Sequence, residues 1–145
     1  MPRKFMFTRE EIVKTALDIT REKGISAVTA RGLAEKLGSS SKPVFSIFEN
    51  MSELHCAIIE AANREYSEFT DRYIKSGKYT PYKASGIAYI FFAKENRELF
   101  KLLFMRDRSK EIISENREEL APIIDMIIKN TGMSRERAYR FHLEM

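Results

Sequence analysis

The chain has 145 residues, of which 43% are apolar and 32% charged, and its formal net charge is +4. This length and apolar content suffice for one compact unit or two small joined ones and argue against a disordered chain. No run approaches the roughly 18 apolar residues of a membrane span, and "MPRKFMFTRE" lacks the apolar block of a secretory signal, so we expect a cytoplasmic protein.

The first predicted helix begins after Thr8, because Thr8 and Glu11 have the spacing of a capping box. Phe7 precedes the cap, where it is placed to pack on the helix as a hydrophobic staple. Gly24 is expected to end this helix. The residues of its apolar stripe are Ile12, Val13, Ala16, Leu17 and Ile19.

Two short helices are expected next. Thr29 is a good N-cap for "ARGLAEKL", which Gly38 ends. A third helix, "SKPVFSIF", is predicted with Ser39 or Ser40 as its N-cap, because a proline is tolerated in the first turn of a helix. The capping-box pattern recurs at Asn50 and Glu53 and predicts a long fourth helix. The apolar stripe of that helix is Leu54, Ile58, Ala62, Tyr66, Phe69 and Tyr73.

The second half of the chain also predicts helices. Residues 75–82 contain Gly77 and Pro81 and are expected to form a loop. Apolar residues cover nearly the whole circumference over residues 83–106, which predicts buried helices with a break near Asn96. Residues 107–117 are polar and charged, which predicts a connector or a weak helix. An isoleucine stripe over residues 123–128 predicts another helix, and Ser134 is the expected N-cap of a last one. The expected fold class is all-α.

The second and third predicted helices carry the candidate functional motif. Ala34, Gly38 and Val44 have the spacing of a helix-turn-helix, in which Ala34 allows close approach and Gly38 supplies a positive φ. Val44 and Phe48 are four residues apart and are the expected apolar anchors. The side chains left to face base edges and phosphates are Ser40, Ser41, Lys42, Phe45 and Ser46.

A purely structural corner is the competing interpretation, since any three-helix corner can contain these three residues. Charge does not decide the question. Residues 1–50 hold nine Lys or Arg against six acids, and the remaining 95 residues hold sixteen against fifteen. This basic excess is compatible with a polyanion, but on charge alone an ordinary solvated surface is the stronger interpretation.

The order of these segments resembles the N-terminal domain of the tetracycline-repressor (TetR) family of bacterial transcriptional regulators. The matching segments are "TREEIVKTALDITREKG", "VTARGLAEKLGSS" and "VFSIFENMSEL", which together cover about residues 7–56. Later segments such as "KENRELFKLLFMRD" and "LAPIIDMII" are similar to family sequence but less diagnostic. The resemblance implies a helix-turn-helix domain at residues 1–50, with a recognition helix at about 40–48, and a helical ligand-binding and dimerisation domain at residues 51–145.

The resemblance also implies which residues contact DNA. The family's phosphate and base contacts fall on Thr29, Arg31, Ser40, Ser41, Lys42, Phe45, Ser46 and Met51. Two of these depart from the family pattern. The family usually has a tyrosine where Phe45 stands, so the phosphate hydrogen bond of the tyrosine hydroxyl is lost here. It commonly has a lysine where Met51 stands, and the absence of that cation should weaken the sequence-independent part of the DNA affinity. Lys42 is expected to compensate in part for the missing cation.

For the second domain, the resemblance implies a homodimer that binds a palindromic operator, most simply as a repressor, and is released by a small apolar effector. The expected effector-pocket residues are Tyr66, Phe69, Tyr89, Phe92, Phe100, Phe104 and Met126, although such side chains more often form only a core. Family chains continue with a further helix, which usually forms the dimer contact. We therefore expect a C-terminally incomplete member with weakened or displaced dimerisation.

An enzyme is not expected. His55 and His142 are far apart in sequence, and Cys56 is the single cysteine, so no catalytic, metal or cofactor site is predicted and an internal disulfide is excluded. The remaining alternative is a helical adaptor that uses the same corner to contact protein. Salt distinguishes the two hypotheses, because phosphate contacts weaken steeply with salt and apolar contacts do not.

Overall fold

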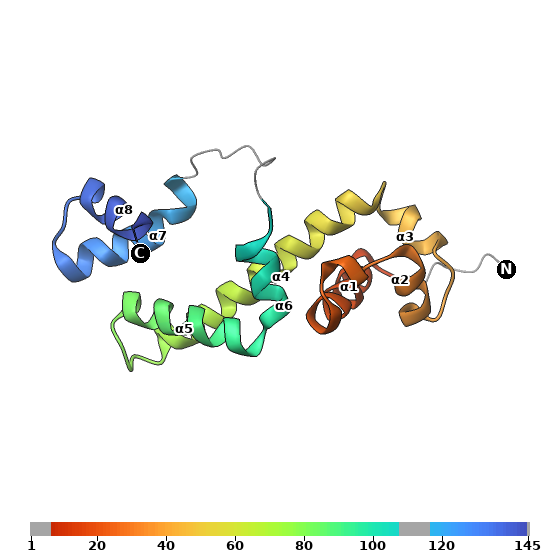
Figure 1. Cartoon of the computed structure of the whole chain (residues 1–145), viewed down its shortest axis with the longest axis horizontal. Helices are drawn as coiled ribbons and strands as arrows, with labels where there is room; N and C mark the ends of the chain where they lie inside the picture. The colour runs from red at the N-terminus through yellow and green to blue at the C-terminus, as the bar shows by residue number, and fades with distance from the viewer. Residues whose placement is uncertain (1–6, 108–116, 145) are drawn as a thin grey trace. The chain divides into compact units, whose positions relative to one another are not determined.

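The computed structural model describes residues 7–107 and 117–144, and within these ranges every regular element is helical, which confirms the predicted all-α class (Figure 1). Two of the elements are not α-helices, a 3-10 turn (η1) and a π-helical segment (η2). The elements in chain order are α1 (Arg9–Lys23), η1 (Ile25–Ala27), α2 (Ala30–Leu37), α3 (Lys42–Ile47), α4 (Met51–Lys75), α5 (Pro81–Glu95), α6 (Arg97–Phe100), η2 (Lys101–Met105), α7 (Arg117–Thr131) and α8 (Arg135–Leu143).

The chain divides into two compact units. The first comprises Met1–Glu68 and Phe91–Arg106, and the second comprises Phe69–Ile90 and Asp107–Met145. The long helices α4 and α5 each contribute to both units. The predicted functional boundary at residue 50 falls between α3 and α4, inside the first unit, so α1, α2 and α3 share that unit with most of α4.

Helix α1 begins as the sequence predicts. Thr8 and Glu11 form a complete capping box, in which the Glu11 amide donates to Thr8 Oγ1 at 3.2 Å and the Thr8 amide donates to Glu11 Oε2 at 2.7 Å. Ile12 and Ala16 of the predicted stripe are fully buried. Thr20 is buried on the same helix, and its hydroxyl donates to the Ala16 carbonyl at 2.8 Å, so this polar side chain is satisfied without a distant partner.

Gly24 ends α1 in a conformation that only glycine adopts readily. Its φ is 89° and its ψ is 163°, and its amide donates to the Thr20 carbonyl at 2.8 Å. A Cβ atom at this position would lie 3.0 Å from Glu98 Oε2. The C-terminal end of α1 therefore lies close to the first turn of α6, within the first unit.

The start of α4 corrects one detail of the prediction. Asn50 Oδ1 accepts from the Glu53 amide at 2.9 Å, as a capping residue should. The Glu53 carboxylate, however, accepts at 2.7 Å from the amide of Glu49 and not from that of Asn50. The expected reciprocal box is therefore wrong by one residue, because the chain entering α4 presents the preceding amide to the carboxylate.

The segment 83–106 has the predicted break but not the predicted burial. Helix α5 ends at Glu95, Asn96 has non-helical dihedrals, and α6 begins at Arg97. The prediction that these helices are buried around nearly their whole circumference is wrong, because Ile90 is 66% exposed and Met105 is 69% exposed. Tyr89, Phe91 and Phe104 are exposed as well. A run of apolar residues thus indicates helix here but overstates how much of each helix is covered.

The second unit has its own small core, made by α7 and α8. Ile124, Ile127 and Ala138 are buried there, with Tyr82 and Phe141 packed against them. The predicted isoleucine stripe is confirmed, and Ser134 caps α8 by accepting from the Arg137 amide. Burial raises the pKa of the Tyr82 hydroxyl. The connector predicted at 107–117 lies almost entirely outside the described residues.

Candidate nucleic-acid interface

A compact hydrogen-bonded turn joins α2 to α3. Thr29 caps α2 by accepting from the Gly32 amide at 2.9 Å. At the other end Gly38 is left-handed, with φ 66° and ψ 32°, as its predicted role requires. The Gly38 amide donates to the Glu35 carbonyl at 3.2 Å and the Ser39 amide to the Ala34 carbonyl at 3.0 Å. These two bonds are those of a Schellman motif, which stops α2 and redirects the chain.

Helix α3 is shorter than the predicted recognition helix. It spans Lys42–Ile47, so the expected N-caps Ser39 and Ser40 are wrong. Ser41 occupies the cap position, but its side chain makes no capping hydrogen bond. Ser39 belongs instead to the turn that ends α2, and its hydroxyl donates to the Ser40 carbonyl at 2.9 Å. The polar residues expected in the first turn of α3 therefore lie largely in the preceding turn.

The two faces of α3 differ sharply in exposure. Val44 is completely buried and Phe48, which ends the helix, is 1% exposed, as expected of anchors. The Arg9 guanidinium lies 4.7 Å from the centre of the Phe48 ring and links the start of α1 to this anchor. By contrast, Phe45 is 45% exposed, and Lys42 and Ser46 are exposed beside it. The turn and α3 thus present a polar surface containing one aromatic ring.

The other predicted contact residues lie at the surface of the same unit. Thr29, the N-cap of α2, and Arg31 in its first turn are exposed, Ser40 is exposed, and Ser41 and Met51 are half-buried. Arg31 forms an ion pair with Glu35 at 3.3 Å. Both side chains of this pair are highly exposed, so the pair is weak and Arg31 is readily released to another anion. Ala34, predicted as a packing residue, is half-buried, while its neighbour Leu33 is completely buried.

Arg21 connects α1 to the rest of the first unit. Its guanidinium donates to both carboxylate oxygens of Glu65 on α4, at 2.9 and 2.7 Å, and to Asn96 Oδ1 at 3.1 Å. The hydrogen bonds to Glu65 raise the pKa of Arg21, against a smaller opposing effect of burial. Asn96 lies at the break between α5 and α6. A single side chain therefore ties α1 to α4 and to the α5–α6 junction, a contact that the sequence did not indicate.

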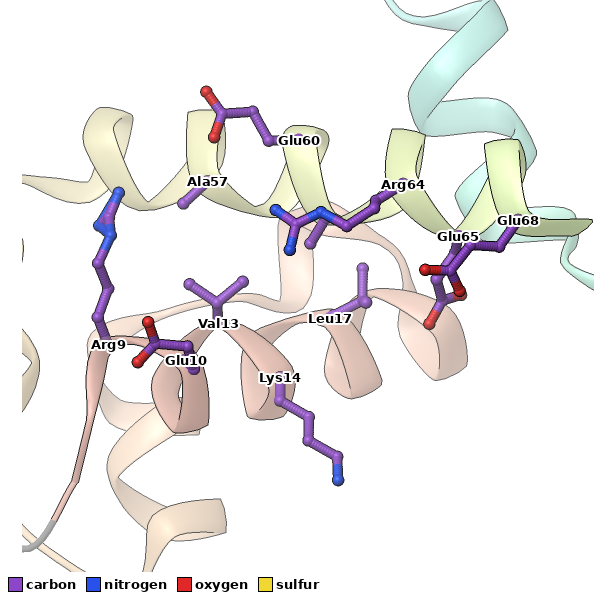
Figure 2. A pocket seen from close by; sticks show the side chains of 11 residues that line it. Arg9, Glu10, Val13, Lys14, Leu17, Ala57, Glu60, Arg64, Glu65 and Glu68 are labelled. Atoms are coloured by element: carbon purple, nitrogen blue, oxygen red, sulfur yellow. The ribbon is translucent and has the colours of Figure 1, made fainter.

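A groove of about 330 Å³ lies between α1 and α4 (Figure 2). Val13, Leu17, Ala57 and Ala61 form its apolar part. Charged side chains of both signs surround these residues, and Lys14 points away from α4 in Figure 2. This groove was not predicted and contains none of the expected effector-pocket residues. Its mixed charges are poorly suited to a small apolar ligand. The charged residues are Arg9, Glu10, Lys14, Glu60, Arg64, Glu65 and Glu68.

The predicted effector-pocket residues are divided between the two units. Tyr66, Phe92, Phe100 and Phe104 belong to the first, where the Tyr66 ring lies 5.1 Å from each of the Phe92 and Phe104 rings in an edge-on arrangement. The rings of Phe100 and Phe104 are 4.9 Å apart. Phe69, Tyr89 and Met126 belong to the second unit. Four of the seven residues thus form one aromatic cluster, and their role in ligand binding stays a prediction.

In the part of the chain that the structure describes, no three His, Cys, Asp or Glu side chains are grouped so as to hold a metal ion. Nor does any helix of that part have the length and apolar character needed to cross a membrane. Comparison of the sequence with protein-family models and with curated proteins finds no match.

Proposed function

We propose that this chain is a ligand-responsive transcriptional regulator of TetR type, which binds double-stranded DNA through α3 and the turn before it. The observation that carries the proposal is the asymmetry of this segment. Val44 and the C-cap Phe48 are buried, whereas Lys42, Phe45 and Ser46 project from α3. A reading helix needs anchors on one side and cationic or hydrogen-bonding groups on the other.

The outward groups have the chemistry of a DNA-contacting surface. Lys42 supplies a cation for phosphates, and the serine hydroxyls donate or accept at base edges. Ser46 Oγ donates to the Pro43 carbonyl at 2.8 Å, which leaves its lone pairs available to a donor on a base. Phe45 offers apolar contact of the kind that a thymine methyl makes. Thr29 and Arg31 on α2 extend the polar surface toward phosphates.

In this proposal the active form is a homodimer on a palindromic operator, most simply a repressor. Two copies of α3 then read half-sites about one helical turn apart, roughly 34 Å. The aromatic cluster of Tyr66, Phe92, Phe100 and Phe104 is the candidate site for an apolar effector. Arg21 supplies a route from that cluster to α1, since it holds α4 and the α5–α6 junction together. An effector that separates these helices would reposition α1 and, with it, α3.

An adaptor that binds protein is the second candidate, and the exposure of Phe45 favours it over a purely structural corner. The two candidates differ in their response to salt. Each phosphate contact contributes about 0.9 to the log-log slope of affinity against salt concentration, whereas a contact built on Phe45 alone would change little.

Two substitutions on α3 test the proposed roles. Lys42→Ala should weaken binding to every duplex and reduce the salt slope by about one. Ser46→Ala should instead change the preferred sequence, at a cost of about 0.5–1.5 kcal/mol on the favoured site. Titrations of labelled duplexes by fluorescence anisotropy would measure both effects. Equal losses on all sequences from both substitutions would contradict the assignment of a phosphate contact to one residue and a base contact to the other.

A further inference from the structure

A long stretch of the sequence that contains positive charges but no acid lies away from α3. Residues 72–94 contain five Lys or Arg and no Asp or Glu, and this is the longest stretch of the sequence without an acid. Its five positive charges exceed the formal net charge of the whole chain, which is +4. Four of these cations surround the turn between α4 and α5, in the second unit. We call them the turn cations: Arg72, Lys75, Lys78 and Lys83.

The turn cations are exposed and have no acidic partner among the residues that the structure describes. All four side chains are exposed, and none of them forms an ion pair within residues 7–107 and 117–144. The nearest acid in sequence, Asp71, pairs with none of them. Surface cations usually occur mixed with acids, so an unpaired group of four produces a local positive potential.

Local structure explains why two of the four turn cations are favoured at their positions. Arg72 and Lys75 lie in the last turn of α4, where a cation is favoured by the helix dipole, and Arg72 also stacks over the Phe69 ring at 5.2 Å. Lys78 and Lys83 lie beyond the end of α4. Their ammonium groups lie 5.6 and 5.3 Å from the centre of a single ring, that of Tyr79. Two like charges are thus gathered at one residue, which an anion between them would stabilise.

We infer that the α4–α5 turn is a second nucleic-acid contact, which binds the phosphate backbone of duplex DNA through Lys78 and Lys83 without reading its sequence. Phosphates along a strand offer repeated charges that match a group of separate lysines. A membrane surface fits the turn less well, because none of the exposed large apolar side chains of the described residues lies between residues 72 and 83. The inference does not depend on α3 being a reading helix.

The test compares two variants that lose the same charge from the same unit. Lys78→Gln/Lys83→Gln removes the cations at Tyr79, and Lys129→Gln/Arg137→Gln removes two exposed cations of α7 and α8 that form no ion pair in the described part of the chain. Affinity of the full chain for a labelled duplex of arbitrary sequence is measured over a range of salt concentrations. The turn variant should bind at least roughly tenfold more weakly near 0.1 M salt, with a slope smaller by nearly two. The control variant should match the unsubstituted chain.

Equal behaviour of the two variants would overturn the inference. It would also be overturned if phosphatidylcholine vesicles containing phosphatidylserine bound in a manner dependent on Lys78 and Lys83 while the duplex did not. Failure of the α3 proposal gives a different result. In that case Lys42→Ala would leave duplex binding unchanged, while the turn variant would still weaken it. Circular dichroism of each variant verifies that the helices are retained.

Discussion

Replacing Phe48 by alanine should lower the free energy of unfolding of this chain by about 3–5 kcal/mol. The side chain is 1% exposed and is one of the largest buried side chains of the first unit, so its removal leaves a cavity that neighbouring backbone cannot fill. The stacking of Arg9 on the ring is lost as well. A loss of this size is a large part of the stability of an ordinary domain. Urea denaturation followed by circular dichroism would measure it.

The matched control is Phe45→Ala, three residues earlier, within α3. Because Phe45 is 45% exposed, this substitution should cost about 1 kcal/mol or less. If α3 reads DNA, Phe45→Ala should also weaken DNA binding while the fold is retained. If both substitutions destabilised the chain equally, the assignment of one phenylalanine to the core and the other to the reading surface would be wrong.

Gly24→Asn should destabilise the chain by about 1–3 kcal/mol, because φ 89° with ψ 163° is a conformation almost confined to glycine. The new side chain would also have to displace the Glu98 carboxylate, which lies 3.0 Å from the expected Cβ position. That carboxylate is the end of a flexible side chain, so the backbone conformation supplies most of the cost. Thermal and urea unfolding of the variant would measure the loss.

The same substitution at Gly38 is the control for the backbone effect. Gly38 has φ 66° and ψ 32°, a left-handed conformation that asparagine tolerates, and no heavy atom beyond its two chain neighbours lies within 4 Å of an added Cβ. Gly38→Asn should therefore cost less than about 1 kcal/mol. Equal losses at the two positions would show that a positive φ alone, and not the particular conformation of Gly24, determines the cost.

Local patterns predicted the helices well, since their signals lie within a few residues of each other. Thr8 with Glu11, Thr29, Gly38 and Ser134 all cap or end helices as expected. These predictions depend on hydrogen bonds between residues three or four apart, which the sequence contains directly. The start of α3 was misplaced because three consecutive serines offer equivalent caps. In the structure, the backbone of the turn after Gly38 places Ser41 at the cap position.

Contacts between distant segments could not be predicted in the same way. The bonds of Arg21 to Glu65 and Asn96 join residues 44 and 75 positions apart, and no local pattern indicates such a partner. The exposure of Ile90 and Met105 could not be predicted for the same reason, because it too depends on contacts between distant segments. An apolar run shows that a helix is able to be buried on several sides, but the number of neighbours depends on the packing of the whole unit. The aromatic cluster around Tyr66 was anticipated only as a list of suitable residues.

Whether α3 reads DNA sequence can be measured by selection of the full chain against a random-sequence duplex pool at moderate salt, followed by sequencing of the retained duplexes. We expect enrichment of an inverted repeat whose half-sites lie about one helical turn apart, and loss of that preference in Phe45→Ala. Retention of duplexes without any sequence preference, equal for the unsubstituted chain and for Phe45→Ala, would contradict the claim that α3 reads DNA.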